Sequence, residues 1–405
     1  MGGAGVSLAT GAEAIYFNPA GIAGPSGGQI SLNFSPTLSK YSGKIGISDV
    51  QRDSKTAFSP IFGFVASYGL TPQLGVGAGV YVSGGSKAIY ENQDFTDLGA
   101  GLTVFNPTIQ TQLTLVEYAL GASYELMPHL KIGASWRILR VSATFGSVGF
   151  VPSATGKVGA IAASTIDDLS ATRYNGFKLG AQWTSDDNSY GLGATWRTSV
   201  NFIAKGTSSG TLIAASGTST PLTGTATEVS STFPSQVTLG GYYDVLPKVL
   251  RVVPEYVWTE YAVNSELGIS GSIVVPGAPA PSPYSNIKQG WKNQSNLRLG
   301  FEYLAMDPIT IRAGYVFTSQ VVPAERARAT FSAPGAGHTI TAGAGTSILD
   351  KTLDIDGAIE YSVASGSGAT DDALKLPSGT VLATGSTGDF STKAYALHTG
   401  VTYHF

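Results

Sequence analysis

The chain has 405 residues, of which 13% are charged, and its formal net charge is −3. Soluble domains usually carry about a quarter of charged residues, and a nearly neutral chain gives no sign of a nucleic-acid partner. Cysteine is absent, which excludes disulfides and thiol chemistry, and no apolar run approaches the roughly 18 residues of a transmembrane helix. A closed β-barrel then remains as the way to cross a bilayer, because it satisfies every backbone polar group internally.

The first residues differ from the rest. Residues 2–22 read GGAGVSLATGAEAIYFNPAGI, which is small and apolar with one carboxylate, and they lack two-residue alternation. One or two helical turns are expected over 9–17, ending at Asn18-Pro19, because proline disfavours helix in the preceding residue. A segment this apolar that is too short to span a bilayer needs to be buried in a protein interior. We therefore expect residues 1–27 to form a plug, after removal of a signal peptide, inside a barrel formed by residues 28–405.

Alternation in residues 28–405 predicts an all-β fold, a 14-stranded antiparallel transmembrane β-barrel. In the last strand, 389–405, Tyr395, Leu397 and Val401 share one parity, whereas the other parity is small or polar. The same pattern recurs over 297–303 and 309–317. Oily outward faces with aromatic residues near both ends are typical of transmembrane barrels. A soluble β-sandwich would not expose such residues on every strand.

The connections alternate between short and long, which gives an even number of strands with both termini on the short-turn side. In bacterial outer-membrane barrels that side is periplasmic. The expected tight turns are 71–73, 127–129, 185–189, 246–248, 306–308 and 350–352, and the expected long connections are 41–56, 84–110, 149–170, 205–225, 270–287, 319–337 and 366–388.

Two long connections, 84–110 and 149–170, are expected to be partly helical. Apolar residues recur at helical spacing over 95–105 and again over 157–169. Either each helix covers the barrel rim with its apolar side, or the two apolar faces oppose each other and form an external groove.

Strand parity also sends charges into the lumen. Isolated charges inside a barrel are costly, so we expect most of them to be paired and to hold the plug to the wall. The inward residues are Arg137, Lys178, Arg197, Arg298, Arg312, Glu117, Glu302, Asp356 and Glu360.

The stretch EAIYFNPAG at residues 13–21 resembles the N-terminal hatch motif of the outer-membrane long-chain fatty-acid transporters of the FadL/TodX type. The resemblance extends to PSQVTLGGYY at 234–243, to residues 296–323 and to the terminal Phe405. It implies passive uptake of hydrophobic compounds, long-chain fatty acids foremost. Ligand would land in an external groove, enter a lumenal pocket and leave sideways through a gap at a kinked third strand.

The resemblance also implies roles for individual residues. Asn18, Pro19 and Ala20 would be the hatch motif, the alternative being an ordinary Asn-Pro turn. Gly84 and Gly85 would mark the kink, unless they simply begin the loop. The groove would be lined by Phe95, Leu98, Leu102, Phe105, Ile161 and Leu169, and the candidate carboxylate-binding residues are Arg140, Arg326 and Arg328.

Other functions remain open at this point. The same route suits neutral hydrocarbons, either monoaromatics or alkanes, and a general diffusion porin is a further alternative. No residue spacing supports a catalytic triad at His398, and the acidic pairs 186–187 and 371–372 are typical of solvated loops, so we expect no enzyme, no metal and no cofactor. The expected partners are a hydrophobic ligand, outer-membrane lipid and lipopolysaccharide, with the protein a monomer.

Overall fold

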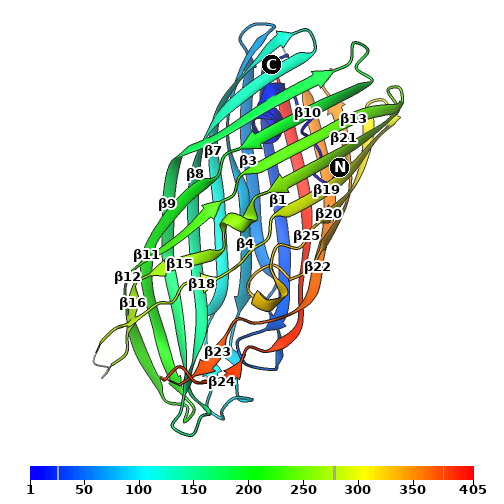
Figure 1. Ribbon diagram of the computed structural model, residues 1–405. Helices are drawn as coiled ribbons and strands as arrows, with labels where there is room; N and C mark the ends of the chain where they lie inside the picture. The colour runs from blue at the N-terminus through cyan, green and yellow to red at the C-terminus, as the bar shows by residue number, and fades with distance from the viewer. Residues whose placement is uncertain (25–26, 277–279, 377) are drawn as a thin grey trace.

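The computed structural model describes residues 1–24, 27–276, 280–376 and 378–405. Its main feature is one antiparallel sheet that closes on itself, since the last strand pairs with the first as well as with its predecessor. Figure 1 shows the tilted strands around a common axis. In the described ranges the fourteen ring positions are β1 (Gly27–Lys44), β3 (Ala57–Gly69), β4 (Leu74–Tyr90), β7 (Ile109–Met127), β8 (Leu130–Pro152), β9 (Val158–Thr184), β10 with β11 (Tyr190–Arg197, Val200–Ala214), β13 with β12 (Gln236–Leu246, Ser219–Phe233), β14 (Leu250–Thr259), β19 (Gln294–Met306), β20 (Ile309–Thr318), β21 (Gly337–Ile348), β22 (Leu353–Ala369) and β25 (Thr387–His404).

The remaining elements are short and are not part of this ring. The short strands are β2 (Gln51–Asp53), β5 (Gln93–Asp94), β6 (Thr103–Val104), β15 (Glu266–Ser270), β16 (Ser272–Val274), β17 (Ser282–Pro283), β18 (Ile287–Lys288), β23 (Ala373–Lys375) and β24 (Val381–Thr384). The helical turns are η1 (Gly11–Glu13), α1 (Ala14–Phe17), η2 (Pro19–Ile22), η3 (Tyr261–Val263) and η4 (Ala324–Arg326). No helix in the part of the chain that the structure describes is both long and apolar enough to cross a membrane.

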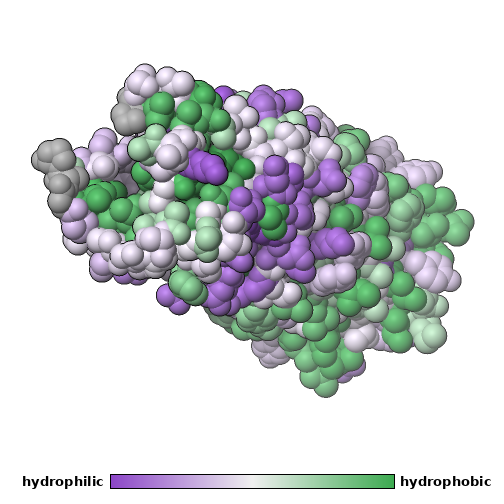
Figure 2. All heavy atoms as spheres, turned by 90° about the horizontal axis from the view of Figure 1, so that it is seen from below, coloured by the Kyte–Doolittle hydropathy of each residue, from purple (hydrophilic) through white to green (hydrophobic). Residues whose placement is uncertain are grey.

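The outer face of the ring is apolar, which confirms the predicted transmembrane β-barrel. On β25, Tyr395, Leu397 and Val401 are 57%, 50% and 41% exposed, and apolar residues on the other strands behave alike. Figure 2, which looks at the end with the long loops, shows hydrophobic side chains along the flank and hydrophilic ones gathered near the middle of that end. A lipid-facing belt of this kind is what a transmembrane barrel needs.

The two predicted loop helices are wrong. Residues 158–169 belong to β9, which pairs with β8 on one side and β11 on the other. Residues 95–102 form the turns between β5 and β6, and 103–104 are β6 itself. Periodicity alone does not separate short helices from strands, and β-branched Val158, Ile161 and Ile166 favour a strand. The expected connections at 149–170 and 205–225 are therefore mostly strand. With 27 residues, β9 is much longer than the roughly 10 residues that cross a bilayer as a strand.

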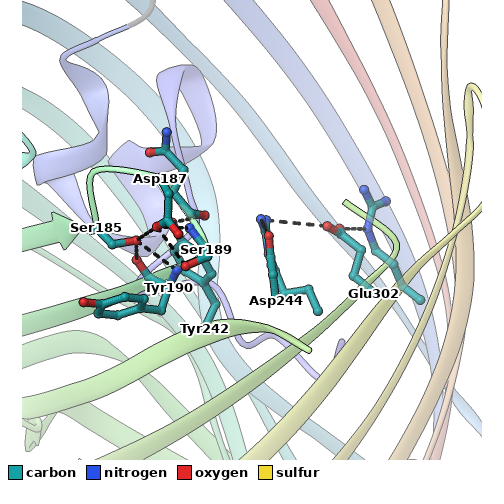
Figure 3. Close-up of polar contacts among 10 residues, drawn as sticks. Ser185, Asp187, Ser189, Tyr190, Tyr242, Asp244 and Glu302 are labelled. Carbon is teal, nitrogen blue, oxygen red and sulfur yellow. Dashed lines mark hydrogen bonds and ion pairs between the residues drawn. The ribbon is translucent and has the colours of Figure 1, made fainter. Parts of the chain in front are cut away.

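At the opposite end the turns are short. In the β9–β10 turn, Asp187 Oδ1 accepts hydrogen bonds from Ser185 Oγ (2.7 Å) and from Ser189 N (3.1 Å) and Oγ (2.8 Å) (Figure 3). These bonds, the one from Ser185 first, lower the pKa of Asp187 to about 2. The carboxylate thus organises the backbone of a turn that has no cross-strand partner of its own.

The plug, residues 1–24, lies inside the ring near the end that carries the C-terminus (Figure 1). The expected boundary after residue 27 adjoins the start of β1 at Gly27, and residues 25–26 lie outside the described residues. Wall glycines make room for the plug backbone: a Cβ added at Gly133 would come 2.4 Å from the oxygen of Pro19, and one at Gly193 would come 2.3 Å from that of Val6. These close approaches explain why inward positions of several strands carry no side chain.

Candidate functional site

Asn18 connects the plug to itself and to the wall. It is fully buried, and its amide Nδ2 donates to the carbonyls of Val6 (2.8 Å) and Ala181 (3.0 Å). Its Oδ1 accepts from Ala20 N (3.1 Å), which caps η2, and Pro19 occupies the first helical position. Asn-Pro-Ala is thus suited to begin a helical turn, and its asparagine also reaches β9.

Wall side chains satisfy the other backbone groups of the plug. Glu255 Oε2 accepts from Gly5 N and Val6 N at 2.9 Å each. Gln182 Nε2 donates at 3.0 Å to the carbonyls of Val6 and Ala9, and Lys131 Nζ donates at 3.0 Å to that of Ala23. A short irregular segment makes few backbone hydrogen bonds of its own, so these contacts hold it in place.

Most lumenal charges are paired, as the sequence predicts. Glu117 and Arg137 pair at 2.5 Å with both side chains 2% exposed, and Arg298 pairs with Glu255 at 2.7 Å. Arg312 bridges Glu302 (2.8 Å) and Asp356 (2.5 Å). Such pairs offset the cost of removing the charges from water.

The pairing continues towards the short-turn end. Asp244 and Glu302, labelled in Figure 3, both pair with Arg251, at 2.6 and 3.8 Å. His398 lies 3.3 Å from Glu360, and its Nδ1 is 2.9 Å from Ser35 Oγ. The β1–β25 ladder skips Ser35 and the following proline, which has no N–H to donate, so the Ser35–His398 contact joins the strands there.

Two inward cations differ from the other lumenal charges because they form no ion pair among the described residues. Arg197 and Lys178 are direct cross-strand partners on β10 and β9. Lys178 Nζ donates to the Tyr16 carbonyl of the plug. Among the described residues Arg197 has no ion pair, its Nε is buried without a hydrogen-bond partner, and its guanidinium lies 4.3 Å from the ring centre of Phe233. Like charges directly opposite each other are unfavourable, so this position suits an anion.

A packed cluster of buried apolar side chains, called the apolar lining below, lies beside these cations on the side of the long loops. It is built from inward residues of β7, β8, β9, β11, β12 and β15, and it includes Leu115, Leu139, Val141, Leu169, Phe202, Val229, Phe233 and Leu267. A cationic group next to an apolar lining matches a molecule with one anionic end and a hydrocarbon body.

The residues predicted to line an external groove do not form one in the part of the chain that the structure describes. Phe95, Leu102 and Ile161 are fully buried in a cluster that closes the loop end, and Leu98 packs against them. Phe105 is 62% exposed, away from this cluster, and Leu169 belongs to the lumenal lining instead. Because the two helices do not form, there are no opposed apolar faces. The side chains of Phe95, Leu102 and Ile161 instead pack together at the loop end.

The arginines predicted to bind a carboxylate lie elsewhere. Arg140 is exposed on the outer face, three residues after the inward Arg137, so alternation already turns it away from the lumen. Arg326 pairs with Asp371 at 2.5 Å at the loop end. Arg328 lies there beside Asp372, at a cavity of about 50 Å³. In the described ranges no group of three or more His, Asp or Glu forms a metal site.

The wall is interrupted at the third ring strand. The β3–β4 ladder ends at Gly63–Tyr81, although β4 continues to Tyr90. A register shift between Val82 and Gly84 marks a β-bulge, and Gly84 and Gly85 lie within the strand rather than at the start of the loop. Bulges bend a strand and end its regular pairing, so β3 and β4 separate on the loop side of this point.

Comparison with known proteins agrees with this architecture. The whole chain, residues 1–405, matches the family described as outer membrane protein transport protein (OMPP1/FadL/TodX). A search of curated proteins finds no match.

Three solved structures share the fold. A Pseudomonas aeruginosa FadL homologue has a TM-score of 0.78 at 15% identity, covering 99% of this chain and 96% of that one. The Pseudomonas putida toluene transporter TodX gives 0.74 at 18%, covering 100% and 97%. The Ralstonia pickettii toluene transporter TbuX gives 0.70 at 18%, covering 100% and 96%.

Proposed function

Because the chain belongs to the OMPP1/FadL/TodX family of outer-membrane transport proteins, we propose that the hydrophobic compounds it carries are long-chain fatty acids. The observation that supports this cargo is the pair of inward cations Arg197 and Lys178, which has no anionic partner directly opposite, next to an apolar lining. A fatty-acid carboxylate would bind between the two cations, and its chain would lie along the lining. Passive partitioning of such a cargo needs no energy source in the barrel.

The route begins at the loop end, where cargo displaces the apolar cluster around Phe95, Leu102 and Ile161. Movement of the plug about Asn18, Pro19 and Ala20 then changes the position of Lys178, which is bonded to the plug at Tyr16. Cargo leaves sideways where β3 and β4 separate at Gly84 and Gly85. The oily belt contacts membrane lipid and lipopolysaccharide, and the protein acts as a monomer.

A neutral aromatic is the second candidate cargo, and one observation favours it. Arg197 already lies over the Phe233 ring, and an arginine plane also attracts other aromatic rings. Two of the structures that share the fold are named toluene transporters. A general porin is less compatible with the structure, because a porin needs an open lumen. Here the plug packs against glycines of strands around much of the ring.

Uptake of oleate and of toluene by cells that make the protein distinguishes the two cargos. Arg197→Gln should lower oleate uptake about tenfold and leave toluene uptake unchanged, because the loss of a charge-assisted bond costs about 1.5 kcal/mol or more. Arg197→Lys should retain much of the oleate uptake. The matched control is Arg140→Gln, at an exposed position of the wall. If Arg197→Gln lowers the uptake of oleate and toluene equally, or lowers neither, the fatty acid is rejected as the cargo.

A further inference from the structure

A second interruption of the wall lies four strands further round the ring, between β9 and the β10–β11 strand. The ladder runs to Arg197–Lys178 and resumes at Lys205–Ser170. Between these points the described residues 171–176 and 199–204 share no ladder pair, and the one backbone bond at the edge joins Thr198 N to the Phe177 carbonyl at 3.0 Å. This gap, called the second gap below, is similar in length to the one between β3 and β4.

A cavity of about 330 Å³ adjoins the second gap. Its lining is mostly polar and includes Arg173 from one edge, Phe202 and Ile203 from the other, and Ser231 and Asn264 behind them. The carboxylate Glu266 also lines the cavity, and it forms no ion pair with Arg173 among the described residues. Backbone that does not pair at membrane depth is tolerated where it lines a cavity. The second gap is therefore a built feature of the wall, with space for an occupant.

A β-bulge aims Arg173 into this space. Between the cross-strand pairs Arg137–Gly176 and Leu139–Arg173, β8 advances by two residues and β9 by three. The extra residue reverses the alternation of β9, so Arg173 lies opposite the inward, buried Leu139 and on the same face as it. Without the bulge, alternation from the inward Lys178 would turn Arg173 towards lipid.

Arg173 has no ion pair among the described residues, and its Nε is buried without a hydrogen-bond partner. Apolar surface lies on both sides of it. Tyr174 and Phe177 are 62% and 50% exposed on the lipid side, whereas Phe202 belongs to the apolar lumenal lining. A cation between two apolar surfaces matches one anionic head on a hydrocarbon chain.

We infer that the second gap is an additional binding site and side passage for the fatty-acid cargo, with Arg173 holding the carboxylate while the chain crosses between the lumenal lining and the bilayer. This inference rests on the proposed cargo. It adds to the route through β3 and β4 a second way between lumen and membrane, with its own charged residue.

Photolabelling tests this site. The full-length protein in lipid vesicles is irradiated with a palmitate that carries a diazirine on its chain, and the labelled residues are identified by mass spectrometry. Label on Phe202 and Ser231 is expected, because these residues line the cavity. Arg173→Gln should reduce that label at least fivefold, and Arg173→Lys should largely restore it. The control Arg140→Gln changes a charge on the neighbouring strand, outside the cavity.

A diazirine-bearing alkane without a head group separates binding from lipid contact. If both probes label Phe202 equally and Arg173→Gln changes neither signal, the cavity merely admits membrane lipid and the inference is overturned. Absence of label on Phe202 and Ser231, with label at the β3–β4 gap, overturns it as well. Label at the second gap that depends on Arg173, in a protein that takes up no oleate, would instead reject the proposed function and leave the site standing.

Discussion

Loss of the Asn18 side chain should release the plug. In Asn18→Ala the carbonyl of Ala181 and the N–H of Ala20 lose a partner, and the carbonyl of Val6 keeps only Gln182. At about 1 kcal/mol for each of the three bonds, the displaced state gains about 3 kcal/mol. Since about 1.4 kcal/mol is a factor of ten, the displaced population should rise about 150-fold.

Single-channel recording in planar bilayers measures that population. Brief openings of the unaltered protein should become about two orders of magnitude more frequent in Asn18→Ala. Deletion of residues 2–21 sets the upper limit, because it removes the obstruction from the lumen. Asn18→Asp keeps the acceptor that caps η2 but loses both donated bonds, and it buries a carboxylate, so it should open at least as often.

Asn293→Ala is the control, since Asn293 is exposed and bonds to Ala262 N, away from the plug. Opening frequencies that agree between Asn18→Ala and this control would refute the argument that buried asparagine bonds hold the plug. An unchanged conductance after deletion of residues 2–21 would go further and show that the plug does not close the lumen.

Three further changes probe the wall, the buried charges and a turn. Gly180→Val should displace the plug and raise ion conductance, because its Cβ would lie 1.9 Å from a plug oxygen; Gly357→Val, with nothing within 4 Å, should not, and equal effects would contradict the packing argument. Arg137→Met leaves the buried Glu117 without its partner and should lower the free energy of unfolding in urea by about 3–5 kcal/mol. The double variant with Glu117→Gln should lose less, and a single variant more stable than the double one would contradict this. The carboxyl of Asp187 should titrate at about pH 2 by NMR, so its stabilisation of the turn is complete above the ordinary pKa of 3.8 and is lost as the pH falls through about 2; a midpoint at 3.8 would show the turn bonds to be absent.

The barrel could be predicted because it depends on alternation, which the sequence carries at every strand. Tyr395, Leu397 and Val401 face outward as their parity requires, and the plug is recognisable by its lack of alternation. The loop helices could not be predicted correctly, because a short apolar run such as 158–169 satisfies a helical spacing and a strand equally well. The presence of β8 and β11 as partners decides between them.

The site depends on register, which no local pattern contains. Arg197 is inward by parity, but its position opposite Lys178 follows from the pairing of β10 with β9. Arg173 faces inward only because of an extra residue in β9, so alternation alone gives the wrong side. Arg140 is the opposite case, since parity counted from Arg137 would have excluded it from the lumen without any structure.

A plugged lumen should pass hydrophobic cargo and exclude small polar solutes. Vesicles that contain the purified protein can be loaded with radiolabelled glucose and given radiolabelled oleate with a trapping protein inside. Oleate should accumulate well above its level in protein-free vesicles while glucose stays inside. Rapid glucose loss, with oleate uptake no faster than in protein-free vesicles, would contradict it.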